Sequence, residues 1–64
     1  MTLKLERVKR NLTQKQLQDL SGVSMVTIRK IEKGTIENVT LVTYKKLAKA
    51  LDIPVEELIK ESEV

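Results

Sequence analysis

With 64 residues, of which 41% are apolar and 33% charged, the chain is long enough for one domain with a small core. It contains neither cysteine nor histidine, which excludes disulfide bonds and the usual zinc-binding frameworks. Its formal net charge is +3, no apolar run approaches the roughly 20 residues of a membrane span, and no signal peptide is visible. We therefore expect a soluble, cytoplasmic protein that contacts no membrane.

The charge is unevenly distributed along the chain. Residues 1–34 hold eight lysines and arginines against three acids, a net charge of +5. Residues 35–64 hold four lysines against six acids, a net charge of −2. This asymmetry indicates that the first half faces a polyanion. The alternative is a chance division of charge on a solvated surface.

Every periodic segment has the spacing of a helix, and no alternating strand pattern is present. The first predicted helix covers residues 3–10, and Asn11 suits the left-handed conformation that often follows a helix. Two stripes compete for the inward face of this helix. One consists of Met1, Leu5, Val8 and Leu12, and the other of Leu3 and Arg7.

Two further helices are predicted on either side of Gly22, which supplies a tight turn between them. Thr13 and Gln16 have the spacing of a capping box, so the first of these helices begins after Thr13. It extends to about Leu20, with Leu17 and Leu20 pointing inward.

The second helix of the pair begins after Ser24, a favoured N-cap residue, and ends at Gly34, a favoured C-terminal stop. Val23 in the turn is expected to reach the core. The two helices form a helix-turn-helix over about residues 13–33.

Two more helices complete the chain. Residues 35–39 are expected to form a loop, after which Thr40 caps the fourth helix. The apolar face of this helix consists of Tyr44, Leu47, Ala48 and Leu51. The fifth helix is expected to begin with Pro54 at its first position, and residues 61–64 to be frayed. One face of it carries Val55, Leu58 and Ile59. The whole is a compact all-α domain of five helices.

The third predicted helix has an apolar face and a cationic face. At 100° per residue, Ile28 and Ile31 point toward the core. The other face, with Met25 at its leading edge, carries Val26, Arg29, Lys30 and Lys33. A positive stripe on a short helix is often only a solvated surface, but that reading leaves Met25 and Val26 stranded among cations. A DNA groove explains them better, because lysine donates to guanine and an apolar side chain contacts the thymine methyl group.

Phosphate contacts are expected at the two ends of the helix pair. Arg29 and Lys33 lie further along the third helix, where the DNA backbone could be reached. Gln14, in the first turn of the preceding helix, combines a side-chain donor with unpaired backbone N–H groups and the positive end of a helix dipole. Together these features suit phosphate oxygens.

Six segments, taken as a set, carry a specific resemblance. They are Leu-Thr-Gln at 12–14, Leu17, Ser-Gly-Val-Ser at 21–24, Thr-Ile at 27–28, Ile-Glu-Lys-Gly at 31–34 and Leu-Ala-Lys-Ala-Leu at 47–51. In them the chain resembles the Cro/cI-type (XRE) helix-turn-helix family of phage and bacterial transcriptional regulators. The resemblance covers about residues 3–60 and implies a lambda-repressor-like DNA-binding fold, with the third helix in the major groove and dimers on paired half-sites.

The resemblance also assigns roles to individual residues. It places base contacts at Met25, Val26 and Lys30. It places contacts with the DNA backbone at Gln14, Thr27 and Lys33, and it places Ser24 close to the backbone or the base edges. Thr13 and Arg29 complete the expected contacts with the DNA backbone. It pairs Arg7 with Glu32, whose part-buried carboxylate a forked guanidinium suits; the alternative is two unrelated surface charges. Two departures stand out: Gln18 replaces the usual small alanine where the helices of the pair cross, and the loop before the fourth helix is about one residue longer and lacks a proline.

These features predict a sequence-specific regulator of transcription, most simply a repressor that binds a palindromic double-stranded DNA operator as a homodimer associated with the nucleoid. The fifth helix (Val55, Leu58 and Ile59) and residues near the loop before the fourth helix are the expected dimer seam, unless the three side chains only close the monomer core. The alternative function is a protein-interaction module of the same fold: an antitoxin, an antirepressor or an adaptor. No catalytic constellation is present, so we expect neither an enzyme nor a cofactor, metal ion or small-molecule ligand.

Overall fold

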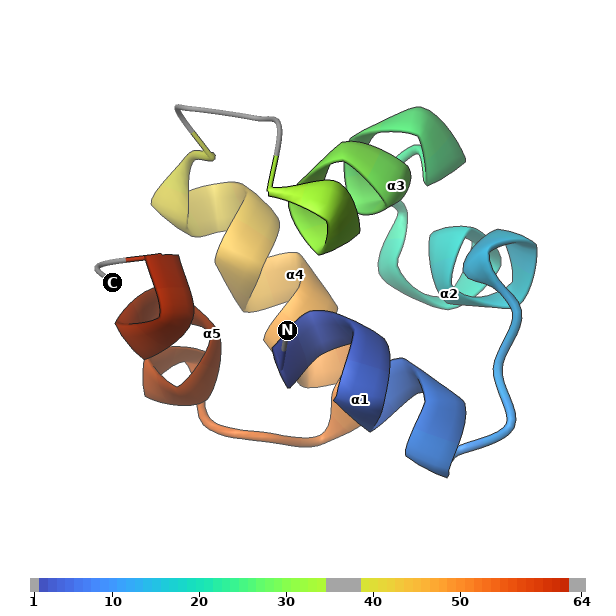
Figure 1. Ribbon diagram of the computed structural model, residues 1–64, viewed down its shortest axis with the longest axis horizontal. Coiled ribbons are helices and arrows are strands. Elements are labelled where there is room, and N and C mark those ends of the chain that lie inside the picture. Colours follow the sequence, from blue (N-terminus) through green and yellow to red (C-terminus); the bar gives the residue numbers. More distant parts are fainter. Residues whose placement is uncertain (1, 35–38, 63–64) are drawn as a thin grey trace.

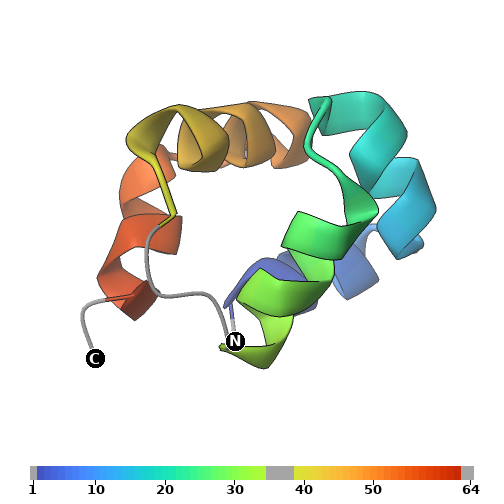
Figure 2. The same ribbon diagram turned by 90° about the horizontal axis from the view of Figure 1, so that it is seen from above.

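The computed structural model describes residues 2–34 and 39–62. They form five helices: α1 (Thr2–Lys9), α2 (Gln14–Ser21), α3 (Met25–Lys33), α4 (Leu41–Leu51) and α5 (Val55–Ser62). This order, with no strand in the described residues, confirms the predicted all-α fold. The helix α4 lies between α5 on one side and α2 on the other (Figure 1), and the view from above agrees (Figure 2). No helix in the described part of the chain is both long and apolar enough to cross a lipid bilayer.

The core collects at least one side chain from each helix. Its buried members are Leu3, Leu17, Val23, Ile28, Ile31, Leu47, Ala48, Leu51 and Leu58. Tyr44 packs against this cluster while remaining partly exposed. Burying one such aliphatic side chain stabilises the fold by about 1.5–3 kcal/mol, so these contacts hold the five short helices together.

The structure resolves the two competing stripes of α1. Leu3 is buried at 1% exposure and the Arg7 side chain is part-buried at 12%, whereas Leu5 and Val8 are 63% and 52% exposed. The inward stripe is therefore the one that contains an arginine. Leu12, beyond the end of the helix, is partly buried against the core.

The prediction that Leu20 points inward is wrong, because this side chain is 61% exposed. The inner face of α2 is centred between Leu17 and Ser21 and is flanked by Gln14 and Gln18. All four side chains are buried or partly buried. At 100° per residue, Leu20 lies well outside that sector. Three of the four inner side chains are polar, so hydrophobic spacing alone placed the face too far toward Leu20.

The predicted helix boundaries are supported by caps. At α2, the Thr13 hydroxyl accepts from the Gln16 backbone N–H at 3.0 Å and the Gln16 side chain accepts from the Thr13 N–H at 2.8 Å. Gly22 and Asn11 have positive φ angles of 78° and 56°, as their positions after helices require. Pro54 is a small exception: α5 begins one residue later, and the Pro54 carbonyl accepts the Glu57 N–H at 3.1 Å. Most of the predicted loop, residues 35–38, lies outside the described residues.

Gln18 contributes a contact that its sequence position did not indicate. Its side-chain oxygen accepts the backbone N–H of Met25 at 2.8 Å. The first N–H groups of a helix have no partner within the helix, so Gln18 satisfies one of them at the start of α3. A longer side chain at the crossing of α2 and α3 thus joins the two helices by a hydrogen bond.

We expect Gln18→Ala to lower the free energy of unfolding by about 1 kcal/mol, because the part-buried Met25 N–H loses its acceptor. Urea denaturation followed by circular dichroism measures this loss. Asp19→Ala is the control, since Asp19 is exposed on the same helix and should change stability by less than about 0.5 kcal/mol. Equal effects of the two substitutions would show that the hydrogen bond adds nothing.

Candidate nucleic-acid interface

The helix α3 has the orientation that its sequence predicts. Ile28 and Ile31 are buried, at 0% and 4% exposure, whereas Val26 is 55% exposed. Arg29, Lys30 and Lys33 are also exposed, and Met25 is partly buried at the leading edge. The outer surface of α3 therefore combines three cations with an exposed apolar side chain, and the isoleucines anchor the helix beneath it.

Hydroxyl groups at the starts of α2 and α3 make local caps. The Ser24 hydroxyl accepts from the Thr27 backbone N–H at 3.2 Å and donates to the Thr27 hydroxyl at 3.0 Å. Thr13 has the corresponding capping role at α2. These caps fix the two helix N-termini, whose remaining first-turn N–H groups carry partial positive charge. Both termini are suited to an anion.

An ion pair forms between Arg7 of α1 and Glu32 of α3, as the resemblance implies. The Arg7 Nε lies 2.7 Å from Glu32 Oε2, and the Arg7 Nη2 lies 3.1 Å from Oε1. The remaining guanidinium nitrogen, Nη1, donates to the Leu12 carbonyl at 2.8 Å. The Glu32 side chain is only 5% exposed. A forked guanidinium thus neutralises a nearly buried carboxylate and ties α1 to α3.

Gln14 extends this pair toward the surface of α3. Its amide nitrogen donates to Glu32 Oε1 at 3.1 Å, and its amide oxygen accepts from the Arg29 Nε at 3.5 Å. A carboxylate only accepts and a guanidinium only donates, so this amide orientation is the one that serves both neighbours. The Gln14 side chain, expected from the sequence to face a phosphate, is thus hydrogen-bonded to two residues of α3.

A small pocket of about 160 Å³ opens where α1, α2 and α3 meet. It is lined by Lys4, Arg7, Gln14, Arg29, Glu32 and Lys33. We refer to it as the basic pocket, because it gathers four cations and one acid. Lys4 was not among the predicted site residues, since it lies outside the helix-turn-helix. The sequence held one indication that Lys4 belongs to this group: it lies three positions before Arg7, on the same face of α1.

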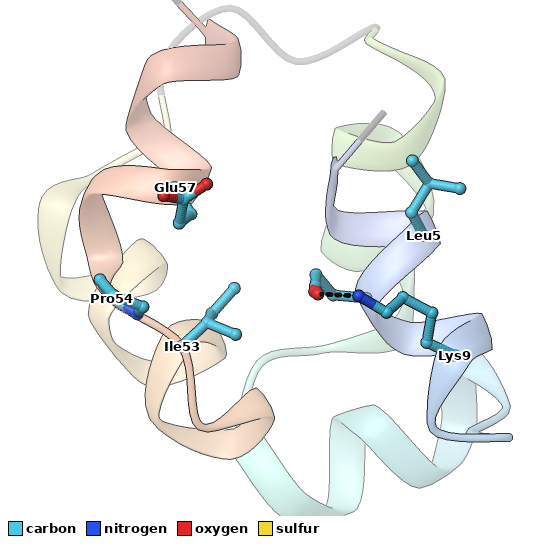
Figure 3. Close-up of a pocket in the computed structure, with 6 residues that line it drawn as sticks. Leu5, Lys9, Ile53, Pro54 and Glu57 are labelled. Atoms are coloured by element: carbon cyan, nitrogen blue, oxygen red, sulfur yellow. Dashed lines mark hydrogen bonds and ion pairs between the residues drawn. The ribbon is translucent and has the colours of Figure 1, made fainter.

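A second, larger groove lies between α1 and α5 (Figure 3). It measures about 420 Å³ and is lined mainly by apolar surface from Leu5, Glu6, Lys9, Ile53, Pro54 and Glu57. A hydrogen bond from Lys9, at 3.2 Å, lowers the pKa of the Glu6 carboxyl below its ordinary value. None of the side chains predicted to contact DNA lines this groove, so it is a surface separate from that of α3.

The predicted dimer seam divides between core and surface. Leu58 is 3% exposed and belongs to the monomer core, while Val55 and Ile59 are partly buried. At the start of α4, near the predicted loop, Leu41 and Val42 are 50% and 61% exposed. Two adjacent apolar side chains are thus exposed at the start of α4.

Comparison with known proteins identifies a family and a relative. The sequence model of the family described as Helix-turn-helix matches residues 3–58. A relative from Vibrio cholerae named cryptic phage CTXphi transcriptional repressor RstR is 40% identical over 57 residues. The alignment covers 89% of this chain and 50% of that protein, so the chain spans about half the length of this relative.

Proposed function

The chain belongs to the Cro/cI-type (XRE) helix-turn-helix family of DNA-binding transcriptional regulators, and on this premise we propose that it represses transcription by occupying a palindromic operator as a homodimer. In this proposal α3 lies in the major groove. The observation that carries it is the outer surface of α3, where exposed Val26 lies among exposed Arg29, Lys30 and Lys33. The name of the Vibrio cholerae relative, a transcriptional repressor, supports the same function.

The proposed contacts divide into two kinds. Met25, Val26 and Lys30 read base edges, lysine by donating to guanine and valine by contacting the thymine methyl group. The DNA backbone is contacted from the start of α2, the start of α3 and the far end of α3. The residues in this second group are Thr13, Gln14, Ser24, Thr27, Arg29 and Lys33. Backbone contacts fix the position of the protein and carry no sequence information directly, whereas base contacts select the operator.

The length of α3 supports the proposed dimer. One helix of nine residues reads about half a site, so useful affinity requires two copies with their recognition helices roughly 34 Å apart. The proposed seam consists of the exposed side chains of Leu41 and Val42 and the partly buried side chains of Val55 and Ile59. Sedimentation equilibrium of the protein and of Val42→Glu tests it: a variant that dimerises as well as the wild type places the seam elsewhere.

Selection of bound sequences from a random duplex pool tests the function as a whole. The expected product is a palindrome that binds much more tightly than random DNA, with an affinity that falls steeply as salt rises. An enriched sequence without two-fold symmetry would contradict the homodimer. A pool that shows no enrichment at all would contradict sequence-specific binding.

The selected operator then separates the two kinds of contact. We expect Lys30→Ala to weaken operator binding by about 1–3 kcal/mol while leaving binding to random DNA nearly unchanged. Lys33→Ala should weaken both duplexes alike and reduce the slope of log affinity against log salt by about one. Fluorescence anisotropy titrations at several salt concentrations measure both effects. Equal losses on the two duplexes for Lys30→Ala would remove Lys30 from base readout.

A further inference from the structure

The basic pocket contains more positive charge than its acid neutralises. Of its four cations, Arg7 is paired with Glu32, and Arg29 contacts only the neutral amide of Gln14 among the pocket residues. Among residues 2–34 and 39–62, no ion pair is formed by Lys4 or Lys33. The side chains of Lys4, Arg29 and Lys33 therefore line one small volume with positive charge that no acid of the pocket neutralises, and an anion bound there would reduce their mutual repulsion.

The size and position of the basic pocket indicate which anion fits. About 160 Å³ is well below the roughly 300–1,000 Å³ of pockets for drug-sized ligands, so the pocket suits a single small group. It opens beside Gln14, the first residue of the eight-residue helix α2, whose N-terminal dipole adds further positive potential. Arg29 and Lys33 come from α3 itself, so the same pocket borders the surface that faces DNA in the proposed function.

We propose that Lys4, Arg29 and Lys33 together bind one phosphate of the DNA backbone, an inference that rests on the proposed DNA-binding function. Lys4 reaches this phosphate from α1, outside the helix-turn-helix. The Gln14 amide lies beside these three cations, where it accepts from the Arg29 Nε at 3.5 Å and donates to Glu32 Oε1 at 3.1 Å. The phosphate supplies the negative charge that the other residues of the basic pocket do not provide for these three cations.

The test compares wild type, Lys4→Ala and Lys9→Ala on the selected operator and on random duplex DNA. Lys9 is the matched control, because it lies on the same helix, is exposed, and is paired with Glu6 outside the basic pocket. Lys4→Ala should bind both duplexes roughly five- to tenfold more weakly and reduce the salt slope by about one, since one phosphate contact is lost. Lys4→Arg, which keeps the charge, should bind as the wild type does.

A second measurement locates the phosphate. Each operator phosphate is replaced in turn by an uncharged methylphosphonate, and affinity is measured for the wild type and for Lys4→Ala. At one phosphate position, the replacement should weaken binding of the wild type and weaken binding of Lys4→Ala much less. If Lys4→Ala has the salt slope of Lys9→Ala and the same methylphosphonate profile as the wild type, the pocket proposal fails while DNA binding stands. If the wild type binds no duplex, the proposed function fails and the pocket proposal with it.

Discussion

Arg7→Ala is expected to lower the free energy of unfolding by about 3–5 kcal/mol, since it leaves a nearly buried charge without its partner. The Glu32 side chain is 5% exposed and receives two of the three Arg7 hydrogen bonds, so the substitution removes two of the donors that compensate for its burial. The third bond, to the Leu12 carbonyl, is lost as well. A domain of 64 residues is stable by roughly 3–10 kcal/mol, and this one substitution removes much of it.

Urea denaturation of three variants measures the effect and its cause. Arg10→Ala is the matched control, because Arg10 is exposed just beyond α1, where it contacts Glu6, and should cost less than about 1 kcal/mol. The double variant Arg7→Leu with Glu32→Leu removes both charges, so it should recover part of the stability that Arg7→Ala loses. A loss below about 0.5 kcal/mol for Arg7→Ala would place both groups in solvent.

The sequence predicted the helix boundaries well, because they depend on neighbouring residues. The capping box of Thr13 and Gln16, the Ser24 cap and the left-handed Gly22 involve residues within a few positions of one another. Hydroxyl caps and glycine turns have the same chemistry in any fold. The pairing of Arg7 with Glu32, which are 25 positions apart, required the family resemblance.

What the sequence missed consists of polar side chains between helices. Gln14 and Gln18 both lie on the inner side of α2, and their hydrogen bonds go to Glu32 and Met25 on α3. A prediction from hydrophobic spacing places glutamine on the outer side of a helix. With Gln14 and Gln18 placed outside, Leu20 was predicted to share the inner face with Leu17. Lys4 was missed because three of its neighbours in the basic pocket, Arg29, Glu32 and Lys33, are 25 or more positions away on α3. Such neighbours become visible only after the helices are packed.

Val26→Glu is expected to weaken operator binding by about 100-fold or more without unfolding the protein. The Val26 side chain is 55% exposed on the outer surface of α3, so the fold should tolerate glutamate within about 0.5 kcal/mol. In the proposed complex the new carboxylate lies between two rows of phosphates, and placing like charges together across an interface costs several kcal/mol. It also removes the apolar contact with a thymine methyl group.

Val8→Glu is the matched control for this substitution. Val8 is 52% exposed on α1, on the stripe turned away from the core, so the same change in residue type and net charge is made at nearly the same exposure. Val8→Glu should reduce affinity only by the general effect of one added negative charge, a few-fold at moderate salt. Fluorescence anisotropy with the selected operator gives both affinities, and thermal unfolding shows that both variants remain folded. If the affinities of Val26→Glu and Val8→Glu agree within a few-fold, α3 does not enter the groove. A negative charge at position 26 weakens binding more than one at position 8 only if position 26 lies against the bases.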